Sequence, residues 1–272
     1  MKMKAGVMGW PVGHSLSPRL HGWWLKHYGI EGSYAALPVK PEELGPALQA
    51  LPAKGFCGVN LTMPHKEAAL PYLDEIEPAA RRVGAVNTVV VMPDGKLQGR
   101  NTDIYGFAQS LLSAGYKTRR RPIVILGAGG AARAVVAALF DVGVGEIRIV
   151  NRTPERAEVL RKAFDSVPQI FGWHDLIRAL VDAELLVNAT SLGMTGAKPL
   201  EVNLDTLPQD ALVTDIVNVP LETDLLKTAR RRGNKTLDGL GMLLHQARPA
   251  FKAFFGVDPE VTDELRRAVL AP

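Results

Sequence analysis

The segment GVNLTMPHK, residues 58–66, carries side chains that suggest chemistry. Apolar residues alternate in it with Asn60 and Thr62, which is typical of a β-strand, and Pro64 ends the strand two residues before Lys66. Alternation places Asn60 and Thr62 on one face, which we expect to be turned away from the core as the wall of a cleft. Lys66 would overlook the same space, where an ammonium group can donate a proton to an oxygen that gains negative charge.

Asp103, in the segment GRNTD, is the second candidate for catalysis. Reduction of a ketone builds negative charge on oxygen, so it needs a proton donor such as Lys66, and a carboxylate would hold that donor in position. The two residues are far apart in the sequence, so only the fold could join them. The alternative stays open, because an aspartate before an apolar helix is an ordinary N-cap and Lys66 could be a surface lysine.

A glycine-rich turn with the pattern G-x-G-x-x-A follows the apolar strand 123–126 and precedes an apolar helix. The first glycine allows a tight turn, the second lets the backbone approach a pyrophosphate, and the N-H groups of the helix start favour an anion. We therefore expect a bound dinucleotide, the alternative being a tight turn without a ligand. The residues expected to contact it here are Gly127, Ala128, Gly129, Gly130 and Ala131.

The choice between NAD and NADP depends on the residues after the second strand of this unit, which here are Asn151, Arg152 and Thr153. No carboxylate is present to bind a ribose 2′-hydroxyl. Arg152 offers a planar cation suited to a 2′-phosphate, Thr153 offers a hydroxyl, and Arg156 adds a second cation one turn further on. The pattern favours NADP, although Thr153 and Pro154 could simply cap the next helix.

The elements that position these residues alternate between strands and helices, which predicts an α/β fold. The first part has a β-α-β-α-β order that favours parallel pairing, followed by a hairpin whose turn is Pro93-Asp94-Gly95. The second part predicts a Rossmann-type doubly wound parallel sheet. We expect an N-terminal α/β substrate domain at 1–103, to which C-terminal helices at 240–272 return, and an NADP-binding domain at 104–239.

The composition excludes several classes of protein. The 272 residues include 47% hydrophobic and 22% charged residues, as in packed globular proteins, and Cys57 is the only cysteine. No intrachain disulfide or thiolate zinc cluster is possible, so we expect a reducing, cytoplasmic location and no metal. The net charge is +4, but the arginine runs at 119–121 and 230–232 are short. We interpret them as solvated helix ends or loops, and we expect neither nucleic-acid nor membrane binding.

The chain resembles the shikimate dehydrogenase family, NADP-dependent enzymes of aromatic amino-acid biosynthesis, over nearly its whole length. The segments that carry the resemblance are, in order, GHSLSP, GVNLTMPHK, GAVNTV, GRNTD, GAGGAARA, NRT, NATSLGM and DGLGMLLHQA. The resemblance implies the reversible reduction of 3-dehydroshikimate to shikimate with NADPH. It also implies a substrate held between the N-terminal domain and the NADP domain.

The same resemblance implies roles for individual residues. Lys66 and Asp103 correspond to the catalytic pair of the family. The residues that would bind the substrate carboxylate or ring hydroxyls are Ser15, Ser17, Asn60, Thr62, Asn87 and Gln246. Further cofactor contacts would come from Thr190, Ile216, Gly239 and Met242. Plain alternatives remain for some of these, namely a strand residue for Thr62, a bend for Asn87, a solvated helix position for Gln246 and a core position for Met242.

One position departs from the family pattern. Where D-x-x-Y-x-P is expected, the chain has Asn218 in place of the tyrosine, between Asp215 and Pro220. A tyrosine there would place a phenol at the substrate end of the cleft.

Other functions also fit parts of the pattern. A quinate/shikimate dehydrogenase that prefers NAD is a close alternative, and a non-catalytic NADP-binding sensor is a more distant one. A methylenetetrahydrofolate dehydrogenase is disfavoured by the S-L-S-P segment. We expect a small-molecule substrate as the partner, and either a monomer or a homodimer.

Overall fold

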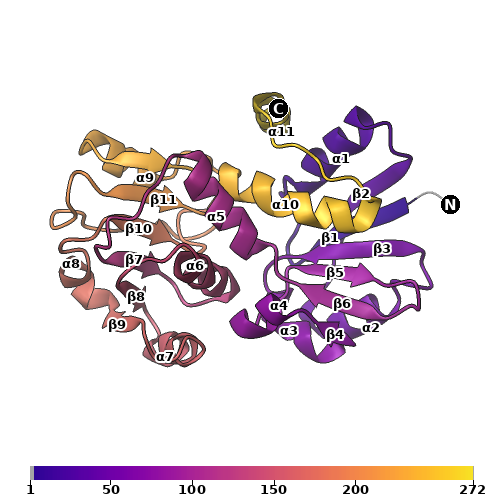
Figure 1. The fold of residues 1–272 in the computed structure, drawn as a ribbon, viewed down its shortest axis with the longest axis horizontal. Coiled ribbons are helices and arrows are strands. Elements are labelled where there is room, and N and C mark those ends of the chain that lie inside the picture. The colour runs from indigo at the N-terminus through magenta and orange to yellow at the C-terminus, as the bar shows by residue number, and fades with distance from the viewer. Residues whose placement is uncertain (1–2, 272) are drawn as a thin grey trace. The chain divides into compact units, whose positions relative to one another are not determined.

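The computed structural model describes residues 3–271, which fold into two compact units, each built on a six-stranded sheet (Figure 1). Unit 1 comprises Met1–Gly106 and Leu244–Pro272, and unit 2 comprises Phe107–Leu243. The expected α/β fold is confirmed. Two helices begin in one unit and end in the other, namely α5 (Asp103–Ser113) and α10 (Leu240–Phe255).

Unit 1 contains a mixed sheet with the strand order β2-β1-β3-β5-β6-β4. The first three strands along the chain, β1, β2 and β3, pair in parallel, and β5 and β6 form the expected hairpin. The elements that this unit contributes besides α5 and α10 are β1 (Met3–Gly9), α1 (Ser17–His27), β2 (Gly32–Pro38), a 3-10 turn (Pro41–Glu43), α2 (Leu44–Gln49), β3 (Phe56–Leu61), α3 (His65–Ala68), a 3-10 turn (Leu70–Tyr72), β4 (Glu75–Ile76), α4 (Pro78–Val83), β5 (Thr88–Val91), β6 (Leu97–Arg100) and α11 (Asp263–Leu270).

Helices cover both faces of this sheet (Figure 1). On one face Leu44 and Leu48 of α2 pack with Val59 and Leu61 of β3 in an apolar cluster. On the other face α1 and α10 supply aromatic rings, and a Cβ added to Gly58 would lie 2.4 Å from the ring of Phe254. A sheet that is covered on both faces leaves only its edges for polar side chains to reach solvent.

The face under α1 and α10 nevertheless holds buried polar groups. Tyr34 on β2 and Asn60 on β3 both point to this face, with only β1 between their strands. Ala5 of β1 pairs with Tyr34 in the sheet register, and its small side chain leaves room for the tyrosine ring. The phenol therefore reaches across β1 and donates a hydrogen bond to Asn60 Oδ1 at 2.7 Å.

Unit 2 contains a parallel sheet with the strand order β12-β11-β10-β7-β8-β9. After β7 the chain builds β8 and β9 on one side and then returns to place β10 on the other side, so the order reverses between β7 and β10. Ligands bind at such switch points in open parallel sheets. The elements are β7 (Ile123–Leu126), α6 (Gly130–Asp141), β8 (Ile147–Asn151), α7 (Pro154–Lys162), β9 (Gln169–Gly172), a 3-10 turn (Trp173–Asp175), α8 (Leu176–Ala179), β10 (Leu185–Asn188), β11 (Leu212–Asp215), α9 (Asp224–Arg231) and β12 (Lys235–Leu237).

Two details differ from the sequence analysis. Strands β9 and β12 were not expected, because they lie at the two edges of the sheet and are only partly buried, so their hydrophobic pattern is weak. The order Ser17-Pro18 suggests from the sequence that Ser17 is the N-cap of the helix that follows, but this interpretation is wrong, because α1 begins at Ser17 itself and Leu16 is the N-cap residue. The backbone N-H of Ser17 instead donates to Ser15 Oγ at 3.3 Å.

The arginine run at 119–121 lies in a loop, as expected, and Arg119 and Arg120 are exposed while Arg121 is half-buried. Arg119 and Arg121 form ion pairs with Asp210. The backbone N-H groups of the same two arginines donate to the fully buried carboxylate of Glu184. Glu184 thereby anchors this loop to the start of β10.

Among the described residues, no helix is long and apolar enough to cross a membrane. Within the same 3–271 range, no group of three or more His, Cys, Asp or Glu side chains is arranged to hold a metal ion.

His21 generates a prediction about acid stability. It is completely buried on α1 and stacks on Tyr34 with ring centroids 3.9 Å apart, and burial lowers its pKa from 6.5 to about 3. The unfolded chain therefore binds a proton between these two pH values that the folded chain does not. The stability that results from a neutral His21 is present above pH 6.5 and is lost as the pH falls towards 3.

We expect His21→Phe, which keeps a stacked ring, to reduce this pH dependence. The free energy of unfolding of the parent chain should fall by about 2 kcal/mol more than that of the variant between pH 7.5 and pH 5. Urea titrations at both pH values measure the difference. Equal pH dependence in the two proteins would contradict the prediction.

Candidate active site

Lys66 lies in α3, directly after β3, as the sequence suggested. Its neighbour His65 is fully buried and donates from Nε2 to the carbonyl oxygen of Val39 at 2.8 Å, which ties α3 to the end of β2. The side chain of Lys66 is 19% exposed. The lysine is therefore held on a fixed turn and is still accessible to a ligand.

Lys66 and Asp103 form an ion pair in unit 1, with Nζ 2.5 Å from Oδ2. Asp103 begins α5, yet its carboxylate does not cap that helix. Asn101 Oδ1 accepts the backbone N-H groups of Asp103 and Ile104, at 3.1 and 3.3 Å. The alternative of an ordinary capping aspartate is therefore wrong, because Asn101 performs that task and leaves the carboxylate to Lys66.

Asn87 holds the other oxygen of the same carboxylate. Its Nδ2 lies 2.9 Å from Asp103 Oδ1 and 3.3 Å from Gln246 Oε1. Its Oδ1 accepts the backbone N-H of Thr102 at 2.7 Å, which sets the direction of the amide. Asn87 thus joins Gln246 of α10 to the ion pair. Asn87 does lie at a bend, directly before β5, whereas Gln246 is buried, so the solvated-helix alternative for Gln246 is wrong.

The remaining substrate-site candidates lie nearby in unit 1. Asn60 is only 6% exposed, and its amide donates to the carbonyl oxygen of Asn87 and to Thr88 Oγ1. The expectation that its face lies away from the core is wrong, because α1 and α10 cover that face. Thr62 is half-buried at the strand end, where its methyl group lies over Gly9, and its hydroxyl makes no hydrogen bond with the described residues.

Ser17 is buried and Ser15 is half-buried at the start of α1. Tyr34 on the neighbouring strand β2 donates a hydrogen bond to Asn60. The structure therefore links this buried phenol through the amides of Asn60 and Asn87 to Asp103 and Lys66. The direct contact of each of these residues with a substrate stays a prediction.

The glycine turn of unit 2 has the geometry that a dinucleotide requires. Gly127 has φ = +107°, which L side chains rarely adopt, and an added Cβ would lie 3.0 Å from Thr190. A Cβ added to Gly129, the N-cap residue of α6, would meet no atom within 4 Å. The space beside the helix start is open, so a pyrophosphate could approach the N-H groups of the twelve-residue helix.

Arg152, Thr153 and Arg156 are exposed after β8. Within the described part of the chain, neither arginine pairs with a carboxylate. Thr153 is the N-cap residue of α7 but makes no side-chain capping bond, and Asn151 Nδ2 donates to its carbonyl oxygen at 2.7 Å. Two cations and a hydroxyl thus remain available at the point where a 2′-phosphate would lie, and the residues fit NADP.

Thr190 follows β10, on the other side of the switch point from β8. Its hydroxyl donates to Asn188 Oδ1 at 2.8 Å, and Asn188 Nδ2 donates to Asp215 Oδ1 at 2.9 Å. Burial raises the pKa of the Asp215 carboxyl, while hydrogen bonds from Val217 N-H, Thr223 and Asn188 oppose the rise. Asp215 and Asn188 therefore hold the Thr190 loop against the glycine turn.

Gly239, one of the remaining cofactor candidates, packs against the segment that follows β11. A Cβ added to Gly239 would lie 2.6 Å from the carbonyl oxygen of Ile216, so only glycine lets these two segments pack. Met242 is 8% exposed in the part of α10 that belongs to unit 2. Asn218 is half-buried after β11 and its side chain bonds to no described residue.

Several residues that hold the site together were not expected from the sequence. The role of Asn101 could have been predicted from the sequence, because an asparagine just before a helix commonly accepts hydrogen bonds from the first backbone N-H groups of that helix. Asn188 and Asp215 each end a buried strand, where parallel sheets place functional groups. Tyr34 has no local signal, because its position on a strand says nothing about its partner across the sheet. The missed residues are Tyr34, Thr88, Asn101, Thr102, Asn188 and Asp215.

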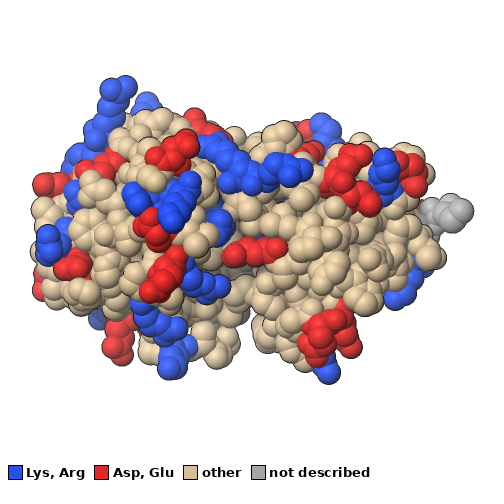
Figure 2. Space-filling view, turned by 90° about the horizontal axis from the view of Figure 1, so that it is seen from below, with Lys and Arg blue, Asp and Glu red and all other residues tan. Residues whose placement is uncertain are grey.

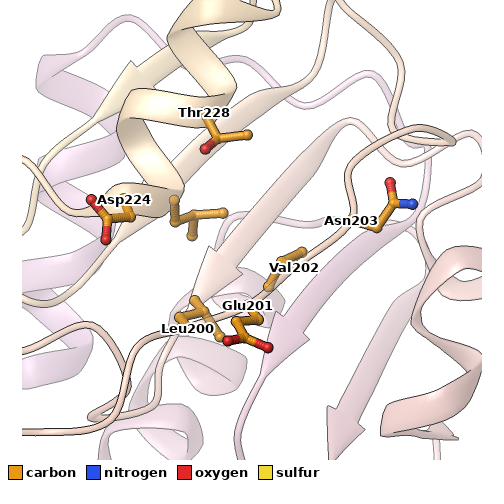
Figure 3. Close-up of a pocket in the computed structure, with 7 residues that line it drawn as sticks. Leu200, Glu201, Val202, Asn203, Asp224 and Thr228 are labelled. Atoms are coloured by element: carbon orange, nitrogen blue, oxygen red, sulfur yellow. The ribbon is translucent and has the colours of Figure 1, made fainter.

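A pocket of about 430 Å³ lies elsewhere in unit 2, between the segment before β11 and α9 (Figure 3). Its carboxylates come from Glu201 and Asp224, and Asp224 pairs with Lys227. None of the predicted site residues lines it.

On the face shown in Figure 2, lysine and arginine side chains are interspersed with aspartate and glutamate side chains, so charge of one sign does not dominate that face.

The two units together define a class of protein. A glycine turn at the switch point of a parallel sheet, with free arginines beside it, is typical of dinucleotide-binding domains. A lysine–aspartate pair among hydroxyl and amide groups is suited to proton transfer at a small polar substrate. The class is that of two-domain dinucleotide-dependent oxidoreductases.

The chain belongs to the shikimate dehydrogenase family. Residues 7–89 match the family model described as the shikimate dehydrogenase substrate binding domain, residues 107–218 match shikimate / quinate 5-dehydrogenase, and residues 239–270 match the shikimate 5′-dehydrogenase C-terminal domain.

Individual relatives agree with this assignment. The chain is 53% identical over 269 residues to shikimate dehydrogenase (NADP(+)) of Paramagnetospirillum magneticum, covering 98% of each chain. It is 39% identical to the shikimate 5-dehydrogenase of Thermus thermophilus, solved with NADP(H) and shikimate, with a TM-score of 0.88 and 98% of each chain covered. It is 32% identical to a quinate dehydrogenase of Corynebacterium glutamicum solved with NAD, with a TM-score of 0.90 and 99% of each chain covered.

Arg152 allows a direct test of cofactor selection. We expect Arg152→Ser to raise the KM for NADP about 10- to 100-fold and to leave the KM for NAD nearly unchanged, because only NADP carries the 2′-phosphate. Steady-state kinetics with each cofactor measure both values. Arg178→Ala, at an exposed arginine of α8, is the matched control. Equal changes for the two cofactors would contradict a phosphate contact.

Proposed function

We propose that this chain catalyses the reversible NADPH-dependent reduction of 3-dehydroshikimate to shikimate, a step of aromatic amino-acid (chorismate) biosynthesis. The observation that carries the proposal is the 2.5 Å ion pair between Lys66 and Asp103, built into a network that includes Asn87 and Gln246. Membership of the family supports the choice of substrate.

The roles of the residues follow from their hydrogen-bonding capacity. Lys66 has three N-H donors, of which Asp103 occupies one, so the others can meet a substrate oxygen. In the direction of reduction, Lys66 donates a proton to the oxygen that develops from the ketone, and it recovers a proton from solvent afterwards. Asp103 keeps the ammonium group in place, and Asn87 keeps Asp103 in place.

The substrate would be recognised by groups of unit 1. Ser15 and Ser17 at the start of α1 would bind its carboxylate, since hydroxyls and N-H groups at a helix start favour an anion. Thr62 has an available hydroxyl, and Asn60, Asn87 and Gln246 supply amides for the ring hydroxyls. A buried donor that a wrong substrate leaves unpaired costs about 1–3 kcal/mol, which is the physical basis of specificity.

The cofactor would be held by unit 2. The helix start after Gly129 would bind the pyrophosphate, and Arg152, Thr153 and Arg156 would bind the 2′-phosphate. Further cofactor contacts are proposed for Gly127, Ala128, Gly130, Ala131, Asn151, Thr190, Ile216, Gly239 and Met242. When bound, NADPH supplies the hydride for the reduction.

Quinate oxidation with NAD is the second candidate, because a quinate dehydrogenase solved with NAD shares this fold at 32% identity. The arginines after β8 favour NADP instead. A silent NADP-binding sensor would not need the Lys66–Asp103 pair.

We further propose that the enzyme works in the cytoplasm, on the basis of its single cysteine, and that it is a monomer or a homodimer.

The activity itself can be measured by absorbance. We expect purified protein to reduce NADP with shikimate as the substrate, and to do so much faster than it reduces NAD with quinate. Absence of shikimate turnover with NADP would overturn the proposal. Similar efficiency for quinate and NAD would move the protein to the second candidate.

Lys66→Ala separates the enzyme from a sensor. We expect kcat to fall at least about 1,000-fold, because the proton donor is lost, while calorimetry still detects shikimate binding. Lys96→Ala is the matched control, since Lys96 is an exposed lysine of the same unit. Turnover that survives in Lys66→Ala would remove this lysine from the mechanism.

A further inference from the structure

Gly9 ends β1 directly beside Thr62, the candidate substrate residue that follows β3. The two strands pair in parallel with Met8 opposite Leu61, so Gly9 and Thr62 are the next positions along them. The backbone N-H of Thr62 donates to the carbonyl oxygen of Met8 at 2.9 Å, and its own carbonyl oxygen accepts from the backbone of His65 at 2.9 Å. The main chain of Thr62 is therefore fixed on both sides.

A side chain at position 9 would collide with this threonine. A Cβ added to Gly9 would lie less than 3.0 Å from Thr62 Cγ2, which is closer than two carbon atoms can pack. The carbonyl oxygen of Met63 and the Cβ of Val12 would lie further away, at 3.1 and 3.3 Å. The backbone of Gly9 is outside the left-handed region, so its φ alone would allow an L side chain. The glycine is thus required chiefly by the methyl group of Thr62.

The position of this methyl group decides where the Thr62 hydroxyl points. The Cβ of a threonine carries a hydroxyl, a methyl group and a hydrogen in staggered positions, so a fixed methyl group also fixes the hydroxyl. Every other staggered rotamer moves both groups at once. Within residues 3–271 the hydroxyl has no hydrogen-bond partner, and it is not one of the buried unpaired atoms. It is therefore open to a ligand, in one direction only.

We propose that Gly9 is a positioning residue for substrate binding: because it has no side chain, it keeps Thr62 in the single rotamer whose hydroxyl meets shikimate. The inference rests on the proposed function, in which Thr62 binds a polar group of the substrate. Gly9 acts only through Thr62, and Lys66 is held separately by Asp103. A change at Gly9 therefore weakens substrate binding more than it slows the chemical step.

Gly9→Ala adds one methyl group and forces Thr62 into another rotamer. We expect the KM for shikimate to rise about tenfold, as for one lost hydrogen bond, kcat to fall less than about threefold and the KM for NADP to stay unchanged. Gly22→Ala is the matched control, because a Cβ at this exposed position of α1 would meet no atom within 4 Å. An unchanged KM for shikimate in Gly9→Ala would overturn the inference.

Thr62→Ser separates positioning from a general loss of structure. Serine keeps the hydroxyl and lacks the methyl group, so it can direct the hydroxyl as before without meeting a Cβ at position 9. We expect Thr62→Ser alone to raise the KM for shikimate about threefold, because its hydroxyl is free to rotate, and Gly9→Ala to add nothing to that value. A KM that multiplies to about thirtyfold in the double variant would overturn the inference.

A measurement on the unaltered protein covers the case in which Gly9→Ala does not fold. The NMR couplings of the Thr62 methyl carbon to its backbone nitrogen and carbonyl carbon report the rotamer, and Thr62→Ser identifies the methyl resonance by its disappearance. We expect one rotamer in the ligand-free protein and the same rotamer after shikimate is added. Couplings averaged over several rotamers, or a new rotamer with shikimate, would overturn the inference.

Kinetics of the parent protein and of Thr62→Val distinguish a failure of this inference from a failure of the proposed function. Thr62→Val keeps the methyl group over Gly9 and removes the hydroxyl, so we expect a rise in the KM for shikimate similar to that of Gly9→Ala. A parent protein that does not turn over shikimate with NADP would overturn the proposed function and the role of Gly9 with it. Turnover by the parent with an unchanged KM in Thr62→Val would overturn the role of Gly9 alone.

Discussion

The Asp103 carboxylate is the charge around which the polar interior of unit 1 is arranged. Its side chain is only 5% exposed, and removing a carboxylate from water costs several kcal/mol unless opposite charge and hydrogen bonds compensate. Lys66 supplies the charge, Asn87 occupies the second oxygen, and Asn101 takes over the capping of α5. A lysine held in this way has a defined direction, which a proton donor requires.

The need to satisfy the buried Asp103 carboxylate also affects residues further away, because every polar group buried beside the Lys66–Asp103 pair needs hydrogen-bond partners of its own. Asn87 can present its nitrogen to Asp103 only because Thr102 and Thr88 donate to its oxygen. Asn60 in turn accepts a hydrogen bond from Tyr34. Three of the substrate-site candidates, namely Asn60, Asn87 and Gln246, and the Lys66–Asp103 pair are therefore parts of one hydrogen-bonded interior, even though they come from separate segments of the chain.

Unit 2 uses a buried aspartate in a similar way. Asp215 ends β11 and accepts hydrogen bonds from Asn188, Thr223 and the backbone of Val217. Asn188 then orders the loop that carries Thr190 beside Gly127. In both units a buried carboxylate fixes a loop, but in unit 1 one partner is the charged ammonium group of Lys66, whereas in unit 2 every partner is neutral.

Local patterns were sufficient for the glycine turn, the arginines after β8 and the strand that leads to Lys66. Each of these depends on neighbours in the sequence, such as a positive φ at Gly127 or a helix that begins within a few residues. The edge strands β9 and β12 were missed because weak burial leaves little hydrophobic pattern. Alternation correctly put Asn60 and Thr62 on one face, but it could not show that α1 and α10 cover that face.

The sequence by itself thus determined the α/β fold, the glycine turn of unit 2 and, through resemblance, the cofactor NADP and the substrate. Only the tertiary structure decided that Asp103 pairs with Lys66 rather than capping α5, and that Tyr34 donates to Asn60 across β1. The physical reason is that a hydrogen-bonding side chain has several possible partners of equal chemistry. Which partner it takes depends on distances across the sheet, and those distances exist only once the strands have paired.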